Sequence, residues 1–147
     1  MASVTAAASR DRLAGRLRLA VTRLSRRMRQ EAGSGLSPSA MSALAAIDRH
    51  GAPSLGELAA SEGIRPPSIT ATVAALEAQG LVVRELDPSD RRISRVRTTV
   101  RGRAQLQRSR TRKTAYLAAR LSGLEEDELR VLDRAAGILE RLLDEGR

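Results

Sequence analysis

The sequence predicts a mainly α-helical fold that carries one small β-hairpin. Three observations lead to this prediction. Apolar residues recur at helical spacing along most of the chain, glycine and proline divide these stretches, and only residues 81–86 and 93–99 favour β-strands. The chain has 147 residues, which is enough for one compact domain and too few for two full ones. Because Tyr116 is the only aromatic residue, the core has to consist of Leu, Val, Ile and Ala.

The first 35 residues are expected to form a tail and one helix. Residues 1–9 are small and polar, so we expect them to be frayed. From residue 10 to about 30, apolar side chains recur at helical spacing with arginines on the other faces, and Gly33-Ser-Gly35 ends this helix. The next helix has Ser37 as its N-cap and Pro38 at its first position, and it ends at Gly51.

Two short helices separated by a tight turn follow. Residues 54–62 begin with Ser54 and Glu57 at the spacing of a capping box, and Gly63 can adopt the positive φ of the turn. Residues 66–79 begin with two prolines, which suit the first turn of a helix. Spacing places three apolar side chains of this second helix inward: Ile69, Val73 and Leu76.

A hairpin comes directly after the second short helix. Its strands are residues 81–86 and 93–99, and its loop is Asp87-Pro-Ser-Asp-Arg-Arg92. A short helix with few outward charges, followed by an arginine-tipped hairpin, is typical of a winged helix-turn-helix, in which the helix enters a major groove of DNA and the hairpin an adjacent minor groove. The sequence therefore predicts a winged helix-turn-helix over residues 36–102.

The C-terminal part, residues 103–147, is expected to form two further helices. A long helix spans about residues 102–122, and the last helix opens with the acidic run 125–128, which favours a helix start. The alternative, a metal site in this run, is disfavoured because adjacent helical residues point in different directions. Like the helix in residues 1–35, the last helix carries an apolar stripe with no partner nearby in sequence. The two stripes are expected to pack on one another or on a second copy.

Candidate DNA contacts fall into three groups. The first consists of outward residues of the second short helix, whose small side chains let its backbone approach the bases: Pro67, Ser68, Thr70, Ala71 and Thr72. The second consists of the loop residues Asp90, Arg91 and Arg92, where Asp90 can hold the tip in shape and either arginine can enter a minor groove. The third consists of arginines that could reach phosphates: Arg65, Arg84, Arg95 and Arg97.

Composition and charge narrow the function classes. The formal net charge of +9 favours a polyanionic partner, although Lys113 is the only lysine among 26 basic residues and codon bias can explain the arginine preference. With no cysteine and only His50 as histidine, disulfides, thiol switches and His- or Cys-based metal sites are excluded. No catalytic arrangement, cofactor motif, secretion signal or apolar run of about 20 residues is found, so we expect a cytoplasmic protein without enzymatic activity, cofactor or membrane contact.

Several segments together resemble the MarR family of transcription regulators. They are Leu36–Leu44, Leu55–Ala59, Ser68–Thr70, Leu76–Val82, the loop Asp87–Arg92 and Gly102. The resemblance implies a homodimer whose terminal helices interlock, bound to a pseudopalindromic operator in double-stranded DNA. It assigns the minor-groove contact to Arg92, oriented by Asp90, with Arg91 as the alternative. It also implies a repressor that a small anionic or phenolic effector releases from DNA, at a site near the first two helices and the long fifth one.

Two features depart from the family pattern, and one alternative function stays open. The usual Leu-Thr after the hairpin is Thr98-Thr99 here, and Pro66-Pro67 stiffens the entry of the second short helix. Met41, Leu44 and Tyr116 are residue types that suit an effector site, but the sequence assigns none of them to it. A nonspecific, architectural DNA-binding protein is the alternative that the high positive charge permits.

Overall fold

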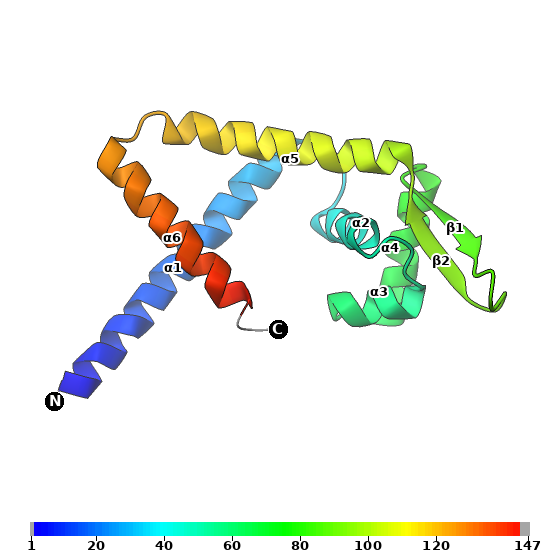
Figure 1. Ribbon diagram of the computed structural model, residues 1–147, viewed down its shortest axis with the longest axis horizontal. Helices are drawn as coiled ribbons and strands as arrows, with labels where there is room; N and C mark the ends of the chain where they lie inside the picture. Colours follow the sequence, from blue (N-terminus) through cyan, green and yellow to red (C-terminus); the bar gives the residue numbers. More distant parts are fainter. Residues whose placement is uncertain (1, 145–147) are drawn as a thin grey trace. The chain divides into compact units, whose positions relative to one another are not determined.

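The computed structural model describes the backbone of residues 2–144 and the side chains of residues 8–144. The chain forms two compact units, of which one ends at Lys113 and the other begins at Thr114. The seven elements of the first unit are α1 (Ala2–Ala32), α2 (Pro38–His50), α3 (Leu55–Glu62), α4 (Pro66–Ala78), β1 (Val82–Leu86), β2 (Ser94–Thr98) and the beginning of α5 (Val100–Leu121). The second unit contains the end of α5 and α6 (Glu126–Asp144) (Figure 1).

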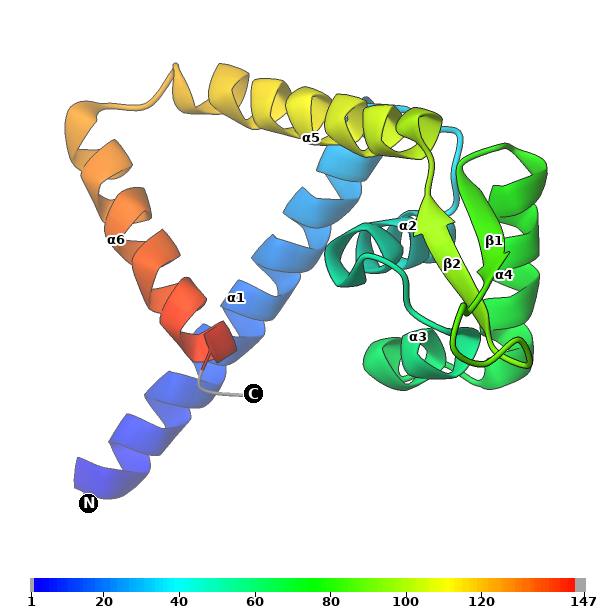
Figure 2. The same ribbon diagram turned by 45° about the vertical axis from the view of Figure 1, so that its right-hand side comes forward.

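The central part of the first unit is a winged helix-turn-helix, as the sequence predicts. Helices α2, α3 and α4 pack on one another and on a hairpin in which β1 pairs antiparallel with β2, with Val82 opposite Thr98 and Leu86 opposite Ser94 (Figure 2). Because α3 and α4 are joined by only three residues, the turn between them is tight. This geometry leaves the outer side of α4 and the hairpin loop on the surface.

The core of this part is aliphatic. The three residues of α4 expected to face inward, Ile69, Val73 and Leu76, are fully buried. Further fully buried side chains come from α2, α3 and β2: Leu44, Ile47, Leu58 and Val96. The apolar spacing therefore identified the inward face of α4 correctly, and with it the outward face.

The predicted signals at the helix ends are confirmed. The Ser37 side chain accepts a hydrogen bond from the backbone N–H of Ala40, with Pro38 at the first helical position. Ser54 and Glu57 form the complete capping box of α3, and Gly63 adopts a left-handed conformation with φ +61° at its end. These interactions fix where α2 and α3 begin and where α3 ends.

Some element boundaries differ from the sequence-based expectations. Helix α1 begins at Ala2, so residues 2–9 are helical rather than frayed, and Met1 lies outside the described residues. The segment contains a run of alanines, and alanine has the highest intrinsic helix propensity of any residue type. Helix α5 begins at Val100, slightly earlier than expected, because the Thr99 hydroxyl accepts a hydrogen bond from the backbone N–H of Gly102 at 3.0 Å and caps the helix.

Gly102 sets the contact between α5 and the hairpin. A Cβ atom at this position would lie 2.1 Å from the carbonyl oxygen of Leu81 and 2.8 Å from Cγ2 of Thr98. Only a residue without a side chain allows this approach. The first turn of α5 therefore packs directly on the start of β1.

Helices α1 and α5 are joined by polar contacts within the first unit. The Arg112 guanidinium donates to the carbonyl oxygen of Ala32 at 2.9 Å, at the C-terminal end of α1. Gln105 Nε2 donates to the carbonyl oxygen of Ser34 at 2.5 Å. Because the last carbonyls of a helix lack partners within it, the Arg112 contact satisfies a group that would otherwise need water.

Long apolar side chains remain exposed on the helices at both ends of the chain. On α1 four of them lie along one stripe, namely Leu13, Leu17, Val21 and Leu24, while Leu19 is exposed on another side of the helix. On α6 no residue is buried. No helix among the described residues is long and apolar enough to cross a membrane.

Candidate nucleic-acid interface

The outward surface of α4 consists of small, uncharged side chains. Pro67, Ser68, Thr70 and Ala71 are exposed and Thr72 is half-buried, so the structure brings the predicted recognition residues together on one surface. Between Pro66 and Ala78 the only charged residue is Glu77. A surface of this kind permits close approach of the helix backbone to a groove.

Two hydroxyl groups on this surface are bonded to the helix itself. Thr70 Oγ1 donates to the carbonyl oxygen of Pro66, and Thr72 Oγ1 donates to that of Ser68, both at 2.9 Å. Spacing in the sequence does not predict these bonds, because threonine in a helix has two accessible rotamers. They determine which groups of α4 remain available to a ligand.

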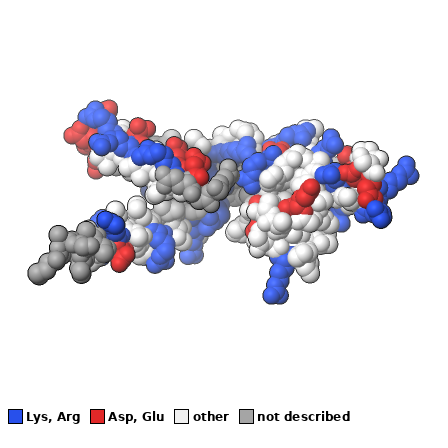
Figure 3. All heavy atoms as spheres, turned by 60° about the horizontal axis from the view of Figure 1, so that its bottom comes forward, with Lys and Arg blue, Asp and Glu red and all other residues white. Residues whose placement is uncertain are grey.

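Basic residues flank this surface. Arg65 immediately precedes α4 as its N-cap residue and is exposed. Arg84 lies on β1 with its Nε atom 3.1 Å from a carboxylate oxygen of Glu77, an ion pair that is not aligned as a hydrogen bond. In Figure 3 most of the compact part seen at the right is uncharged, with a few acidic atoms near its middle, and basic side chains project from its margins beside acidic ones.

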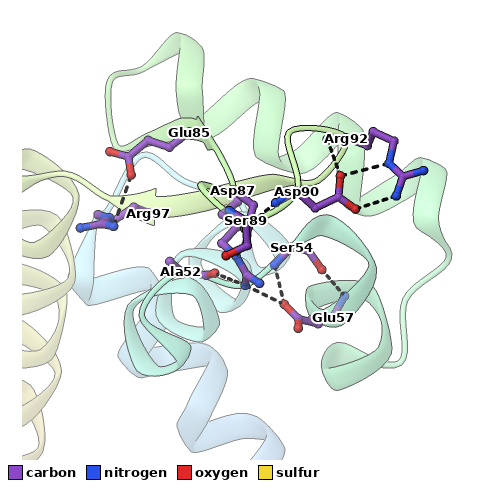
Figure 4. A network of polar contacts seen from close by, with 10 residues as sticks. Ala52, Ser54, Glu57, Glu85, Asp87, Ser89, Asp90, Arg92 and Arg97 are labelled. Atoms are coloured by element: carbon purple, nitrogen blue, oxygen red, sulfur yellow. Dashed lines mark hydrogen bonds and ion pairs between the residues drawn. The ribbon is translucent and has the colours of Figure 1, made fainter.

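The hairpin loop is folded around Asp87, the first residue of the loop motif, whose structural role the sequence does not predict. Its Oδ1 atom accepts hydrogen bonds from the backbone N–H groups of Ser89 at 2.7 Å and Asp90 at 3.1 Å (Figure 4). The residue is buried, and its carboxylate also pairs with the Arg95 guanidinium. These donors hold the pKa of Asp87 below its ordinary value, with the Arg95 hydrogen bond as the largest cause.

Asp90 orients Arg92 through a two-pronged contact. Arg92 Nε and Nη2 donate to the two carboxylate oxygens of Asp90, each at 3.0 Å, and the backbone N–H of Arg92 donates to Oδ1 at the same distance (Figure 4). These hydrogen bonds, chiefly from the Arg92 side chain, lower the pKa of Asp90. The Arg92 side chain nevertheless stays 91% exposed, so it is fixed in direction and open to a ligand.

Arg95 has a structural role that the sequence did not predict. Its guanidinium donates to Asp87, to the carbonyl oxygen of Ala52 at 3.0 Å and to Glu57 at 3.4 Å. It thus joins the base of the loop to the segment before α3 and to the capping box. These bonds use Nε and Nη1 of Arg95, and a phosphate contact through the rest of its guanidinium stays a prediction. Spacing alone does not reveal this structural role, since the partners come from three separate segments.

Arg97 lies on the opposite side of the strand from buried Val96. Its Nη2 atom lies 3.3 Å from a carboxylate oxygen of Glu85 on β1, and both side chains are about half exposed (Figure 4). Such an exposed cross-strand pair contributes little stability, so Arg97 can exchange its partner for a phosphate at small cost. Among the expected phosphate contacts, Arg65 and Arg97 are thus the most accessible.

Together, these features define a winged helix-turn-helix DNA-binding protein. An uncharged helix surface and a loop with an oriented arginine belong to the same compact unit, with basic residues around them. This class of protein inserts the second helix of the motif and the hairpin into neighbouring grooves of a duplex.

Comparisons with known proteins agree with this assignment. The profile of the MarR family matches residues 34–93. An "uncharacterized HTH-type transcriptional regulator" of Mycobacterium leprae is 38% identical over 91% of this chain and 94% of its own. The crystal structure of a "putative transcriptional regulator protein" from Pseudomonas aeruginosa superposes with a TM-score of 0.82 at 36% identity, over 90% of this chain and 95% of that one. The "HTH-type transcriptional repressor MdtR" of Bacillus subtilis is 27% identical over 65% of this chain and 61% of its own.

The chain belongs to the MarR family and is a transcription regulator rather than an enzyme. The resemblance inferred from the loop motif and the helix motifs is thereby confirmed.

Proposed function

We propose that the protein is a homodimeric repressor that binds a pseudopalindromic operator, with α4 in the major groove and the hairpin loop in the adjacent minor groove. The observation that carries this proposal is the combination of an uncharged outer surface on α4 with the exposed, oriented guanidinium of Arg92. A narrow minor groove has a strongly negative potential that attracts such a group. The similarity to the repressor MdtR supports repression rather than activation.

Arg92 is proposed as the minor-groove residue, and Arg91 as its alternative. The fork of hydrogen bonds to Asp90 holds the Arg92 guanidinium in place, which lowers the entropy that it loses on binding. Arg91 is exposed and forms no ion pair with any residue that the structure describes. The two residues therefore differ in preorganisation rather than in charge.

Selection of bound sequences from a random DNA pool tests the function. We expect a symmetric site with half-site centres about one helical turn, ~34 Å, apart. The affinity for this site should exceed that for random DNA by roughly a thousandfold or more. A pool without enrichment, or equal affinity for random DNA, would instead support the nonspecific architectural alternative.

The first prediction distinguishes the two loop arginines on the selected duplex. Arg92→Ala should weaken binding on the order of tenfold to a hundredfold, whereas Arg91→Ala should weaken it only a few-fold. Fluorescence anisotropy at fixed salt measures both variants. The opposite ranking would transfer the groove contact to Arg91.

The dimer is proposed to form through the two ends of the chain, residues 1–35 and 103–147, with residues 36–102 binding DNA. The exposed apolar stripe of α1 and the apolar residues of α6 have no covering partner among the described residues. Apolar areas of this extent mark an interaction surface. Two copies provide the symmetry that a pseudopalindromic operator requires.

A small anionic ligand is proposed to control DNA binding from a cavity of about 400 Å³ between α1, the start of α2 and α5. Arg26, Arg29 and Lys113 line it together with the apolar residues Leu36 and Met41. Ser109 Oγ, also in the lining, is buried without a hydrogen-bond partner. Cations beside apolar groups suit an aromatic carboxylate.

Of the three residues whose chemistry suits an effector site, only one lines this cavity. Met41 is in the lining. Leu44 is instead fully buried in the core, and Tyr116 lies in the other unit, where Arg120 stacks on its ring at 5.1 Å.

The second prediction uses salicylate as the probe. Salicylate should lower operator affinity, and Lys113→Gln should raise the concentration needed for half-release about tenfold, because the variant removes a cation from the cavity. Arg10→Gln, on α1 outside the cavity, is the matched control. A ligand can shift DNA binding only by favouring one conformation of the dimer. Equal half-release concentrations for Lys113→Gln and the wild type would exclude this cavity as the site.

A further inference from the structure

Helix α4 lacks the side chains that recognise purines by paired hydrogen bonds. From Pro66 to Ala78 it contains no Arg, Lys, Asn or Gln. Those residue types make the bidentate contacts to guanine and adenine in the major groove. Base recognition by α4 therefore has to use hydroxyl groups, methyl groups or the backbone.

The hydroxyl protons of the two threonines are already in use. Thr70 donates to the carbonyl oxygen of Pro66 and Thr72 to that of Ser68, each at 2.9 Å. A hydroxyl group has one proton, so neither residue can donate to O6 or N7 of guanine while these bonds persist. The γ-methyl group is the part of each side chain that remains without a polar role.

The third hydroxyl group of the helix differs from these two. Ser68 is exposed in the first turn, and its Oγ forms no hydrogen bond with the residues that the structure describes. The first turn of a helix binds phosphate readily. We therefore expect Ser68 to position the helix on the DNA backbone.

Further apolar groups are exposed on α4. Pro67, Ala71 and Ala74 are exposed on the same helix. Thymine is the one standard base that presents an apolar group, its 5-methyl, in the major groove. The exposed chemistry of α4 thus matches thymine better than it matches guanine.

We propose that α4 recognises its half-site through the 5-methyl groups of thymines, with the γ-methyl of Thr70 as the main contact and that of Thr72 as the second. This inference rests on the proposed function, because it requires α4 to lie in the major groove. The threonine oxygens keep the capacity to accept a hydrogen bond from an adenine or cytosine amino group. Specificity would then come from packing against thymine methyl groups and from accepting hydrogen bonds from base amino groups, rather than from donating hydrogen bonds to purines.

A scan with deoxyuridine tests the DNA side. The highest-affinity duplex from the random pool is synthesised with each thymine replaced in turn by deoxyuridine, which removes only the methyl group. At one or more positions in each half-site the affinity should fall on the order of threefold to fivefold per methyl group. No loss at any position, or half-sites without thymine, would overturn the inference.

Paired variants test the protein side. Thr70→Val keeps a methyl group at the γ position and removes the hydroxyl, so it should bind like the wild type and keep the deoxyuridine penalty. Thr70→Ser removes the methyl and keeps the hydroxyl, so it should bind more weakly and lose that penalty. Circular dichroism and thermal unfolding show whether each variant is folded. The reverse pattern, with Thr70→Ser unaffected and Thr70→Val impaired, would show that the hydroxyl contacts the base.

These outcomes are separate from those of the proposed function. If the protein selects a symmetric operator but shows no deoxyuridine penalty, methyl recognition fails and operator binding stands. If the pool shows no enrichment, operator binding itself fails. Ser68→Ala should weaken all duplexes by a similar factor, and a change in base preference in this variant would assign base recognition to Ser68 instead.

Discussion

At the scale of single residues, one buried carboxylate organises the wing. Asp87 accepts hydrogen bonds from two backbone N–H groups in the loop and pairs with Arg95. Arg95 in turn reaches Glu57, whose pKa is lowered chiefly by the hydrogen bonds of the capping box with Ser54. The loop that presents Arg92 is therefore connected to the start of α3 by charged hydrogen bonds.

The third prediction follows from the lowered pKa of Asp87. A carboxyl group whose pKa falls below its ordinary value of 3.8 on folding stabilises the fold above that pH, and the contribution is lost as the pH falls through the folded-state pKa. Asp87→Asn should lower the melting temperature by a few degrees near neutral pH, and its stability should decline less steeply than that of the wild type below about pH 4.

Thermal unfolding at a series of pH values measures this difference. Asp133→Asn, at an exposed position of α6 without an ion pair among the described residues, is the matched control. Parallel curves for Asp87→Asn and the wild type would mean that the Asp87 charge does not stabilise the folded loop.

At the scale of elements, the junction of the hairpin with α5 fixes where the wing lies. Thr99 caps α5 and also donates from its hydroxyl to the carbonyl oxygen of Gly80 at 2.7 Å. Three residues later, Gly102 packs against the backbone of Leu81. The end of β2, the start of β1 and the first turn of α5 are thus held as one block.

The fourth prediction tests this junction. Gly102→Ala places a methyl group 2.1 Å from the Leu81 carbonyl oxygen, which is backbone and cannot move aside alone. We expect a loss of about 3 kcal/mol or more in the free energy of unfolding, at the upper end of overpacking effects. Urea denaturation measures it.

Gly56→Ala is the matched control for Gly102→Ala. It lies in α3, where an added Cβ would be 4.0 Å from Ser54 Oγ, so the substitution should be neutral or stabilise the fold by up to about 1 kcal/mol. If both variants unfold at the same urea concentration as the wild type, the close approach at Gly102 does not constrain the junction.

At the scale of the whole molecule, the chain has more apolar surface than one copy covers. Leu13 is 54% exposed on α1, and Leu142 is 60% exposed on α6. Burying such side chains contributes roughly 1.5–3 kcal/mol each. A second copy that covers both stripes would therefore be strongly held.

The fifth prediction concerns this proposed dimer. Leu17→Glu, in the middle of the α1 stripe, should raise the dimer dissociation constant at least about a hundredfold and weaken operator binding with it, because a buried charge opposes association. Sedimentation velocity measures the oligomeric state. Thr22→Glu, on the opposite face of α1, should leave the dimer intact. A wild-type protein that sediments as a monomer, free and on DNA, would refute the dimer.

Local sequence patterns were sufficient to predict most elements and the outward face of α4. Caps such as Ser37 and Ser54 act within three residues, and apolar periodicity reflects burial directly, so both can be recognised without a structure. The loop motif likewise led to the pairing of Asp90 with Arg92, because the two residues lie only two positions apart in the turn.

Only the tertiary structure decided which polar side chains already have hydrogen-bond or ion-pair partners within the fold. The partners of Arg95 come from the loop, from the segment before α3 and from α3, and no spacing rule connects these segments. The closeness of Gly102 to Leu81 depends in the same way on how α5 meets the hairpin. The sequence by itself determined the elements and the faces that they bury, because these depend on neighbours within a few residues. The free donors, the close approach at Gly102 and the cavity depend on distant segments meeting, so packing alone could settle them.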